Sequence, residues 1–219
     1  MLKKLSKRLL KGAGIVLLFC FSSAVFAEGD YQIDVVIFSH LTPQTVGAEQ
    51  WPTVADDLTT PALSGQTAQL LPKSDAVLNA QAADLSRQPG FHVVSHIAWR
   101  EHLTGEEQAF ILRDGNLYNS AGTLIAKNLN ANTTPINGNI DITLGHYIDM
   151  KMNLFLVEST AALKQLDSSG YFNKVTQPTF AFQLKESRRM RSRELDYFWH
   201  PVMGVLVKII PIKETQNTA

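Results

Sequence analysis

The residue types best suited to chemistry gather between positions 187 and 201, close to the C-terminus. Guanidinium groups bind carboxylates through paired hydrogen bonds, and aromatic rings offer flat apolar surfaces to sugar rings. The stretch therefore suits an anionic glycan or a carboxylate-bearing peptide. The candidate binding residues are Arg188, Arg189, Arg191, Arg193, Glu194, Tyr197, Trp199 and His200.

The strand that is predicted to begin at Phe180 would place several of these side chains on one face if it continued through the stretch, because alternate residues of a strand share a face. The residues of that face would be Arg189, Arg191, Arg193, Tyr197 and Trp199. The alternative is a solvated edge strand, in which arginines discourage aggregation and pair with nearby carboxylates. Those carboxylates would belong to Glu186, Glu194 and Asp196. Both interpretations stay open from the residues alone.

Two other patterns could indicate a metal centre or a hydrolase. His92 and His96 have the i, i+4 spacing of a zinc site on a helix, but their segment has the composition of a strand, where four residues span about 13 Å. Nitrogens so far apart cannot share an ion with ligand distances of about 2 Å. We therefore predict no metal site and no cofactor.

Glu194 and Asp196 could form a glycosidase pair, since residues two apart on a strand lie about 7 Å from each other on one side. However, the arginines around them would lower the pKa that a general acid needs. The sequence also lacks the Gly-x-Ser-x-Gly motif of serine hydrolases. We predict a protein without catalytic residues and keep a hydrolase as the weaker alternative.

The first 27 residues have the organisation of a secretory signal peptide. Basic residues at the start are followed by the apolar run 15–21 and by small residues up to Ala27. The run is shorter than the roughly 20 residues that span a bilayer, so no membrane span is expected once the leader is removed. Cleavage before Glu28 would also remove Cys20, the one cysteine, so the mature chain would fold without disulfides.

The chain has 20 basic and 20 acidic residues, but five of the basic residues lie in the leader. The predicted mature chain is therefore acidic overall, and its basic character is confined to residues 185–213. Export and overall acidity both argue against a nucleic-acid partner.

The remaining sequence reads as several strands and few helices. Apolar and polar residues alternate from Ile140 to Leu156, which predicts two strands broken near Gly145 and His146. Residues 75–85 have helical spacing behind the possible cap Ser74. The other predicted strands cover 31–38, 91–99, 109–112, 117–118, 180–184 and 204–212, with an Asp114-Gly115 hairpin turn. We expect an α+β fold with a largely antiparallel sheet of about eight strands and one or two helices.

The C-terminal sequence resembles the signature of the CsiV family. The resemblance rests on residues 188–195, Tyr197, His200-Pro201 and the run 204–209 with Pro211. Weaker agreement covers 35–38, 98–100 and 138–156, so the resemblance extends over most of residues 28–219 as a single domain. Asp196, Trp199 and Glu101 depart from the family's pattern.

This resemblance implies a non-enzymatic peptidoglycan-binding protein of the Gram-negative periplasm. It also implies that the protein promotes peptidoglycan synthesis and cell-shape maintenance through an outer-membrane lipoprotein that activates a class A penicillin-binding protein. The alternative is an envelope protein that binds other proteins and never contacts glycan.

Overall fold

The computed structural model describes residues 28–49, 51–52, 69–130 and 135–212, whose strands form two antiparallel sheets. Sheet A has five strands in the order β10 (Leu195–His200), β11 (Met203–Pro211), β1 (Gly29–His40), β3 (Phe91–Leu103) and β2 (Gln69–Leu70). Sheet B has six strands in the order β6 (Leu124–Ala126), β5 (Asn116–Asn119), β4 (Gln108–Arg113), β7 (Ile136–Leu144), β8 (Ile148–Ser159) and β9 (Thr179–Met190).

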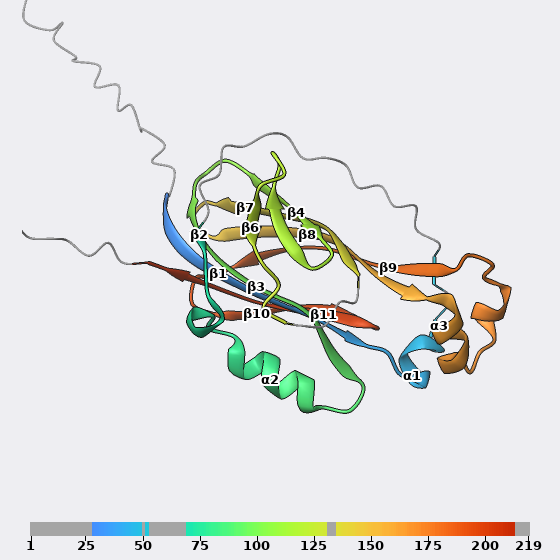
Figure 1. Ribbon diagram of the computed structural model, residues 1–219. Coiled ribbons are helices and arrows are strands. Elements are labelled where there is room, and N and C mark those ends of the chain that lie inside the picture. Colours follow the sequence, from blue (N-terminus) through green and yellow to red (C-terminus); the bar gives the residue numbers. More distant parts are fainter. Residues whose placement is uncertain (1–27, 50, 53–68, 131–134, 213–219) are drawn as a thin grey trace, which may run out of the picture.

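The antiparallel prediction is confirmed, but the described residues form eleven strands rather than about eight, and these divide between two sheets. The two sheets lie face to face, as Figure 1 shows. The chain passes from sheet A to sheet B between β3 and β4, and it returns to sheet A between β9 and β10. As a result β9 is an edge of sheet B, β10 is an edge of sheet A, and these two edges lie beside each other.

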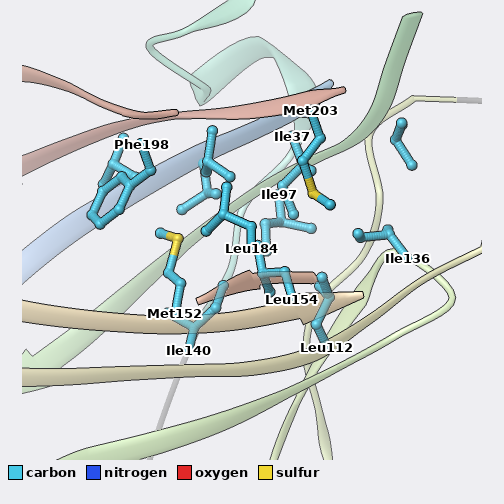
Figure 2. Close-up of a cluster of buried hydrophobic side chains, with 14 of the residues drawn as sticks. Ile37, Ile97, Leu112, Ile136, Ile140, Met152, Leu154, Leu184, Phe198 and Met203 are labelled. Carbon is cyan, nitrogen blue, oxygen red and sulfur yellow. The ribbon is translucent and has the colours of Figure 1, made fainter. Parts of the chain in front are cut away.

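The main core fills the space between the sheets. Figure 2 shows Ile37, Ile97 and Phe198 from sheet A opposite Met152, Leu154 and Leu184 from sheet B. All of these side chains are almost completely buried. Trp99, at the end of the predicted strand 91–99, is fully buried against Phe110. Burial of this apolar surface supplies the main driving force for folding.

The alternation between Ile140 and Leu156 forms the β7–β8 hairpin, with the predicted break at residues 145–147. The Asp114-Gly115 turn is also confirmed, because both residues have positive φ angles of 49° and 75°. Positive φ at both central positions is the geometry of the tight hairpin turns that match strand twist.

Helix α2 (Asn79–Arg87) covers the outer face of sheet A and explains why β1 is apolar on both faces. In Figure 1 it lies on the side of sheet A away from sheet B. Leu78 and the helix residues Ala82 and Leu85 pack against Val36 and Val93, in a cluster separate from the main core. The helix covers only part of this face, because its cluster reaches Leu206 of β11 and β10 lies beyond β11 in the sheet.

The predicted start of this helix is wrong. Residues Lys73–Asp75 form a 3₁₀ turn, the α-helix begins at Asn79, and no side chain next to the start caps it. The carboxylate of Asp34, from the middle of β1, instead accepts the backbone N–H groups of Val77 and Leu78 at 2.6 and 3.1 Å. A distant strand therefore performs the capping that Ser74 was expected to supply.

The two ends of the sandwich differ. At one end lie α1 (Pro43–Val46), α3 (Thr160–Leu166) and the 3₁₀ turn Tyr171–Lys174. At the other end β1 begins, β7 turns into β8, and β9 turns into β10. Among the described helices none has the length and apolar character to cross a membrane. The predicted leader lies outside the described residues.

Candidate functional site

The stretch with most candidate residues is not one continuous strand. Strand β9 ends at Met190, residues 191–194 form a turn, and β10 runs back from Leu195. Arg193 has a left-handed φ of 72°, and its N–H donates to the carbonyl of Ile209 at 2.7 Å. The prediction that five arginine and aromatic side chains share one face is therefore wrong, because the chain reverses and changes sheets between them.

Arg188 of β9 contacts β10 on the neighbouring sheet edge and is not simply exposed to solvent. Its Nη2 donates to Glu186 Oε1 at 2.6 Å, and its guanidinium lies 5.2 Å from the centre of the Phe198 ring. The other oxygen of Glu186 accepts the backbone N–H of Trp199 at 3.3 Å. Burial raises the pKa of the neighbouring Asp196, although the charge of Arg188 opposes this shift. Arg188 thus joins β9 to β10 and is engaged by groups of the protein itself.

Arg189 and Arg191 gather around Tyr147, a residue that sequence reasoning missed. Their guanidinium carbons lie 5.7 and 5.9 Å from its ring centre, within cation–π range. Arg189 also donates to Asp149 at 3.0 Å, across the β8–β9 ladder. The sequence does show that Tyr147 directly follows the predicted strand break near Gly145 and His146. That position brings Tyr147 to the arginines only because β8 pairs with β9.

The outer face of sheet A carries two exposed aromatic residues, Tyr197 and Trp199, in line with the exposed Leu195. We call these three residues, Leu195, Tyr197 and Trp199, the aromatic stripe. Their exposed fractions are 47%, 38% and 63% in that order. Trp199 is the most exposed of the described tyrosines and tryptophans. The Tyr197 ring stacks in parallel on Phe38, with ring centres 6.1 Å apart and planes 6° apart. Burial raises the pKa of the Tyr197 hydroxyl, so the ring is neutral at ordinary pH. The stripe is flat, apolar and beside the area that α2 covers.

Gly204 makes room for this stack. A Cβ at position 204 would lie 2.5 Å from Phe38 Cζ and 2.7 Å from Tyr197 Cε2. We expect Gly204→Ala to displace the Tyr197 ring and to lower the free energy of unfolding by about 1–3 kcal/mol. Near-UV circular dichroism and urea unfolding would measure both effects, and Gly29→Ala serves as the control, because a Cβ there would make only an ordinary contact, 3.5 Å from Tyr31 Cε2. An unchanged near-UV spectrum would contradict the described stack.

His200 is on the opposite face of β10 from the stripe. It is half-buried, 5.6 Å from the Trp51 ring, and burial lowers its pKa to about 4. It is therefore a neutral contact within the domain, and its predicted role in binding stays a prediction. Trp51 itself is buried edge-on against Phe182.

An open cleft of about 650 Å³ lies at the end of the sandwich where these turns meet, and we call it the end cleft. The β9–β10 turn contributes Arg191, Ser192 and Glu194, and β1 contributes Tyr31. The remaining lining comes from the β7–β8 hairpin and the end of β9: Leu144, Gly145, His146, Tyr147, Ile148 and Met190. The lining of the end cleft thus combines charged, aromatic and nearly buried apolar residues.

The two sequence patterns that could indicate a hydrolase or a metal centre do not have the expected geometry. Glu194 lies in the turn and Asp196 on the inner side of β10, so the expected same-face carboxylate pair is wrong. His96 bonds to Asp34 at 2.8 Å rather than facing His92. No group of three metal-ligating side chains occurs among the described residues.

Comparison with known proteins identifies the family. The family model described as "Peptidoglycan-binding protein, CsiV" matches residues 11–212, which is nearly the whole chain. The chain belongs to the CsiV family. A search of curated proteins finds no match.

Among solved structures, the chain is similar to the secretin domain of InvG from the Salmonella SPI-1 injectisome NC-base. The alignment has 7% identity and a TM-score of 0.28, and it covers 88% of this chain and 66% of that one. A TM-score of this size assigns no fold and carries nothing about function. The functional argument for this CsiV-family chain therefore depends on the family and on the site itself.

Proposed function

We propose that the chain binds peptidoglycan without catalysing a reaction, through the surface between β9 and β10. The surface consists of Arg189, Arg191 and Arg193 together with the aromatic stripe. The family supports the ligand. The observation that carries the placement is that one short turn joins exposed guanidinium groups to exposed aromatic rings.

The arginines would bind carboxylates of the wall, and the stripe would pack against sugar rings. Arg193 is exposed in the turn and has no ion pair among the described residues, so its charge is available to a ligand. Arg191 lies 4.0 Å from Glu194, beyond hydrogen-bonding distance. Arg189 is shared with Asp149 and would contribute less.

The cellular setting of the proposal is the periplasm of a Gram-negative bacterium. Cleavage of the predicted signal peptide before Glu28 would release a single domain, residues 28–219. We further propose that this domain promotes peptidoglycan synthesis and maintains cell shape through an outer-membrane lipoprotein that activates a class A penicillin-binding protein. Support for this part comes from the sequence resemblance and the leader pattern alone.

Co-sedimentation of the mature protein with purified sacculi tests the proposal. We expect the wild type to pellet and the triple variant of Arg189, Arg191 and Arg193 to alanine to bind at least tenfold more weakly. Each exposed guanidinium contributes about 1 kcal/mol or less, so the three together are needed for a clear effect. Raising the salt concentration should also weaken binding of the wild type to sacculi, because salt screens exposed charges. Arg87→Ala, an exposed arginine on α2, is the matched control.

Two outcomes would contradict the proposal. Full retention of the triple variant would remove the arginines from the site, and failure of the wild type to pellet would remove peptidoglycan binding by this chain alone. The second outcome would favour the protein-binding alternative, for which the exposed Leu195, Tyr197 and Trp199 side chains are the specific observation. Release of soluble muropeptides from labelled sacculi would instead indicate a hydrolase.

A further inference from the structure

We propose that the end cleft binds the free end of a peptidoglycan stem peptide, whereas the glycan strand lies outside it. This inference rests on the proposed function and assigns a ligand class to one part of the site. Stem peptides carry free carboxylates, and their diamino acid adds an ammonium group next to one of them. A receptor for such an end needs one cation and one anion at a fixed short separation, above an apolar surface.

Arg191 and Glu194 provide that pair of charges. The separation of 4.0 Å between Arg191 Nη1 and Glu194 Oε1 leaves both groups without a mutual hydrogen bond. The two side chains remain 68% and 62% exposed on the wall of the cleft. A ligand carboxylate can therefore take both N–H groups of the guanidinium fork, while a ligand ammonium takes the carboxylate of Glu194.

The surroundings hold Arg191 in place without using its hydrogen bonds. Its guanidinium lies over the Tyr147 ring, which restricts the side chain but leaves its N–H donors available. Arg189 lies over the same ring and is also bonded to Asp149. Of the two guanidinium groups at Tyr147, only that of Arg191 lines the cleft. Arg191 is thus the pre-positioned cation of the site.

The size of the cleft favours the end of a ligand over a continuous chain. Leu144, Ile148 and Met190 line it as part of the main core and are at most 4% exposed. The volume of about 650 Å³ is within the range of small-ligand pockets, which is roughly 300–1,000 Å³. The aromatic stripe is flat and lies on the outer face of sheet A, where a long polymer can pass without a terminus. The two surfaces therefore suit the two components of the wall.

The test is a calorimetric or NMR titration of the mature protein with three probes. The probes are the free tetrapeptide stem, the same peptide with its carboxylates amidated, and glycan strands stripped of peptide. We expect the free peptide to bind, amidation to weaken binding at least tenfold, and Arg191→Ala and Glu194→Gln each to weaken it about five- to tenfold. Arg113→Ala is the matched control, since its guanidinium also lies over a tyrosine ring, 5.6 Å from Tyr118, but not in the cleft.

Trp199→Ala separates the cleft from the aromatic stripe. It should weaken binding of stripped glycan and leave the tetrapeptide unaffected. Equal binding of free and amidated peptide would overturn the inference, and so would peptide binding that Arg191→Ala does not change. If sacculi pellet the protein but no stem peptide binds, the end cleft is not the peptide site and the proposed function stands. If sacculi themselves fail to pellet it, the proposed function fails instead.

Discussion

Replacing Asp34 with alanine is expected to lower the free energy of unfolding by about 3–5 kcal/mol, because it removes one partner of a fully buried polar cluster. The side chain of Asp34 is 0% exposed. Its Oδ2 accepts the N–H groups of Val77 and Leu78, and its Oδ1 lies 2.8 Å from Nε2 of His96, which is also buried. Alanine would leave all three partners without an acceptor beneath the start of α2.

Urea unfolding of the mature protein, followed by far-UV circular dichroism, measures this loss. Asp34→Asn keeps one acceptor oxygen and should cost less than alanine. Asp84→Ala, on the exposed side of α2 and paired only with Arg87 in the described structure, should change stability by less than about 0.5 kcal/mol. A loss below 1 kcal/mol for Asp34→Ala would show that Asp34 does not hold α2 on sheet A.

Loss of α2 in the Asp34→Ala variant would also affect the proposed binding surface. Val36 belongs to the cluster beneath α2 and is paired with Leu206 of β11, which packs against the same cluster and is paired in turn with Tyr197 in the strand ladder. Loss of α2 would therefore uncover the outer face of sheet A next to the aromatic stripe. We expect Asp34→Ala to impair glycan binding only at temperatures where its unfolding is detectable, in contrast to Trp199→Ala.

Local patterns predicted the elements whose determinants are local. The period-two alternation from Ile140 to Leu156 specifies β7 and β8, since each strand has one buried face. Asp114-Gly115 specifies a turn by its own backbone preferences. The cap of α2 could not be found in the same way, because its acceptor is Asp34, more than forty residues earlier in the chain. No window of sequence around Ser74 contains that information.

The sequence predicted which types of residue form the candidate site, but it did not predict how they are arranged. The turn at 191–194 contains neither glycine nor proline, and Arg193 adopts a left-handed conformation that a non-glycine residue seldom takes. Nothing local therefore signals the reversal. The carbonyl of Ile209 that accepts from the turn belongs to β11, and the Tyr147 ring that lies beside two arginines belongs to the β7–β8 turn. Only the pairing of β8 with β9 and of β10 with β11 brings them together.

A second large effect is expected at Glu101, which lies on the inner side of β3 and is 2% exposed. Its Oε2 has no hydrogen-bond partner among the described residues, and desolvation raises the pKa of its carboxyl from 4.5 to about 7, against smaller opposing effects of His102. Glu101 is paired in the ladder with Tyr31, which lines the end cleft. Protonation of this buried acid is thus linked both to folding and to the neighbourhood of the proposed peptide site.

The sign of the effect follows from proton binding in the two states. Between pH 4.5 and about 7 the folded protein keeps the Glu101 proton while the unfolded chain has released it, so stability falls as the pH rises through this window. The total fall is at most about 3 kcal/mol, since each unit of pKa shift corresponds to about 1.4 kcal/mol. Glu101→Gln cannot titrate and should lack this dependence, gaining on the wild type from pH 5 to about pH 7 and levelling off above that. Urea unfolding at each pH, with exposed Glu106→Gln as the control for general charge effects, measures the difference. If wild type and Glu101→Gln changed in parallel across the window, Glu101 would have to be ionised throughout and its surroundings would have to be wetter than described.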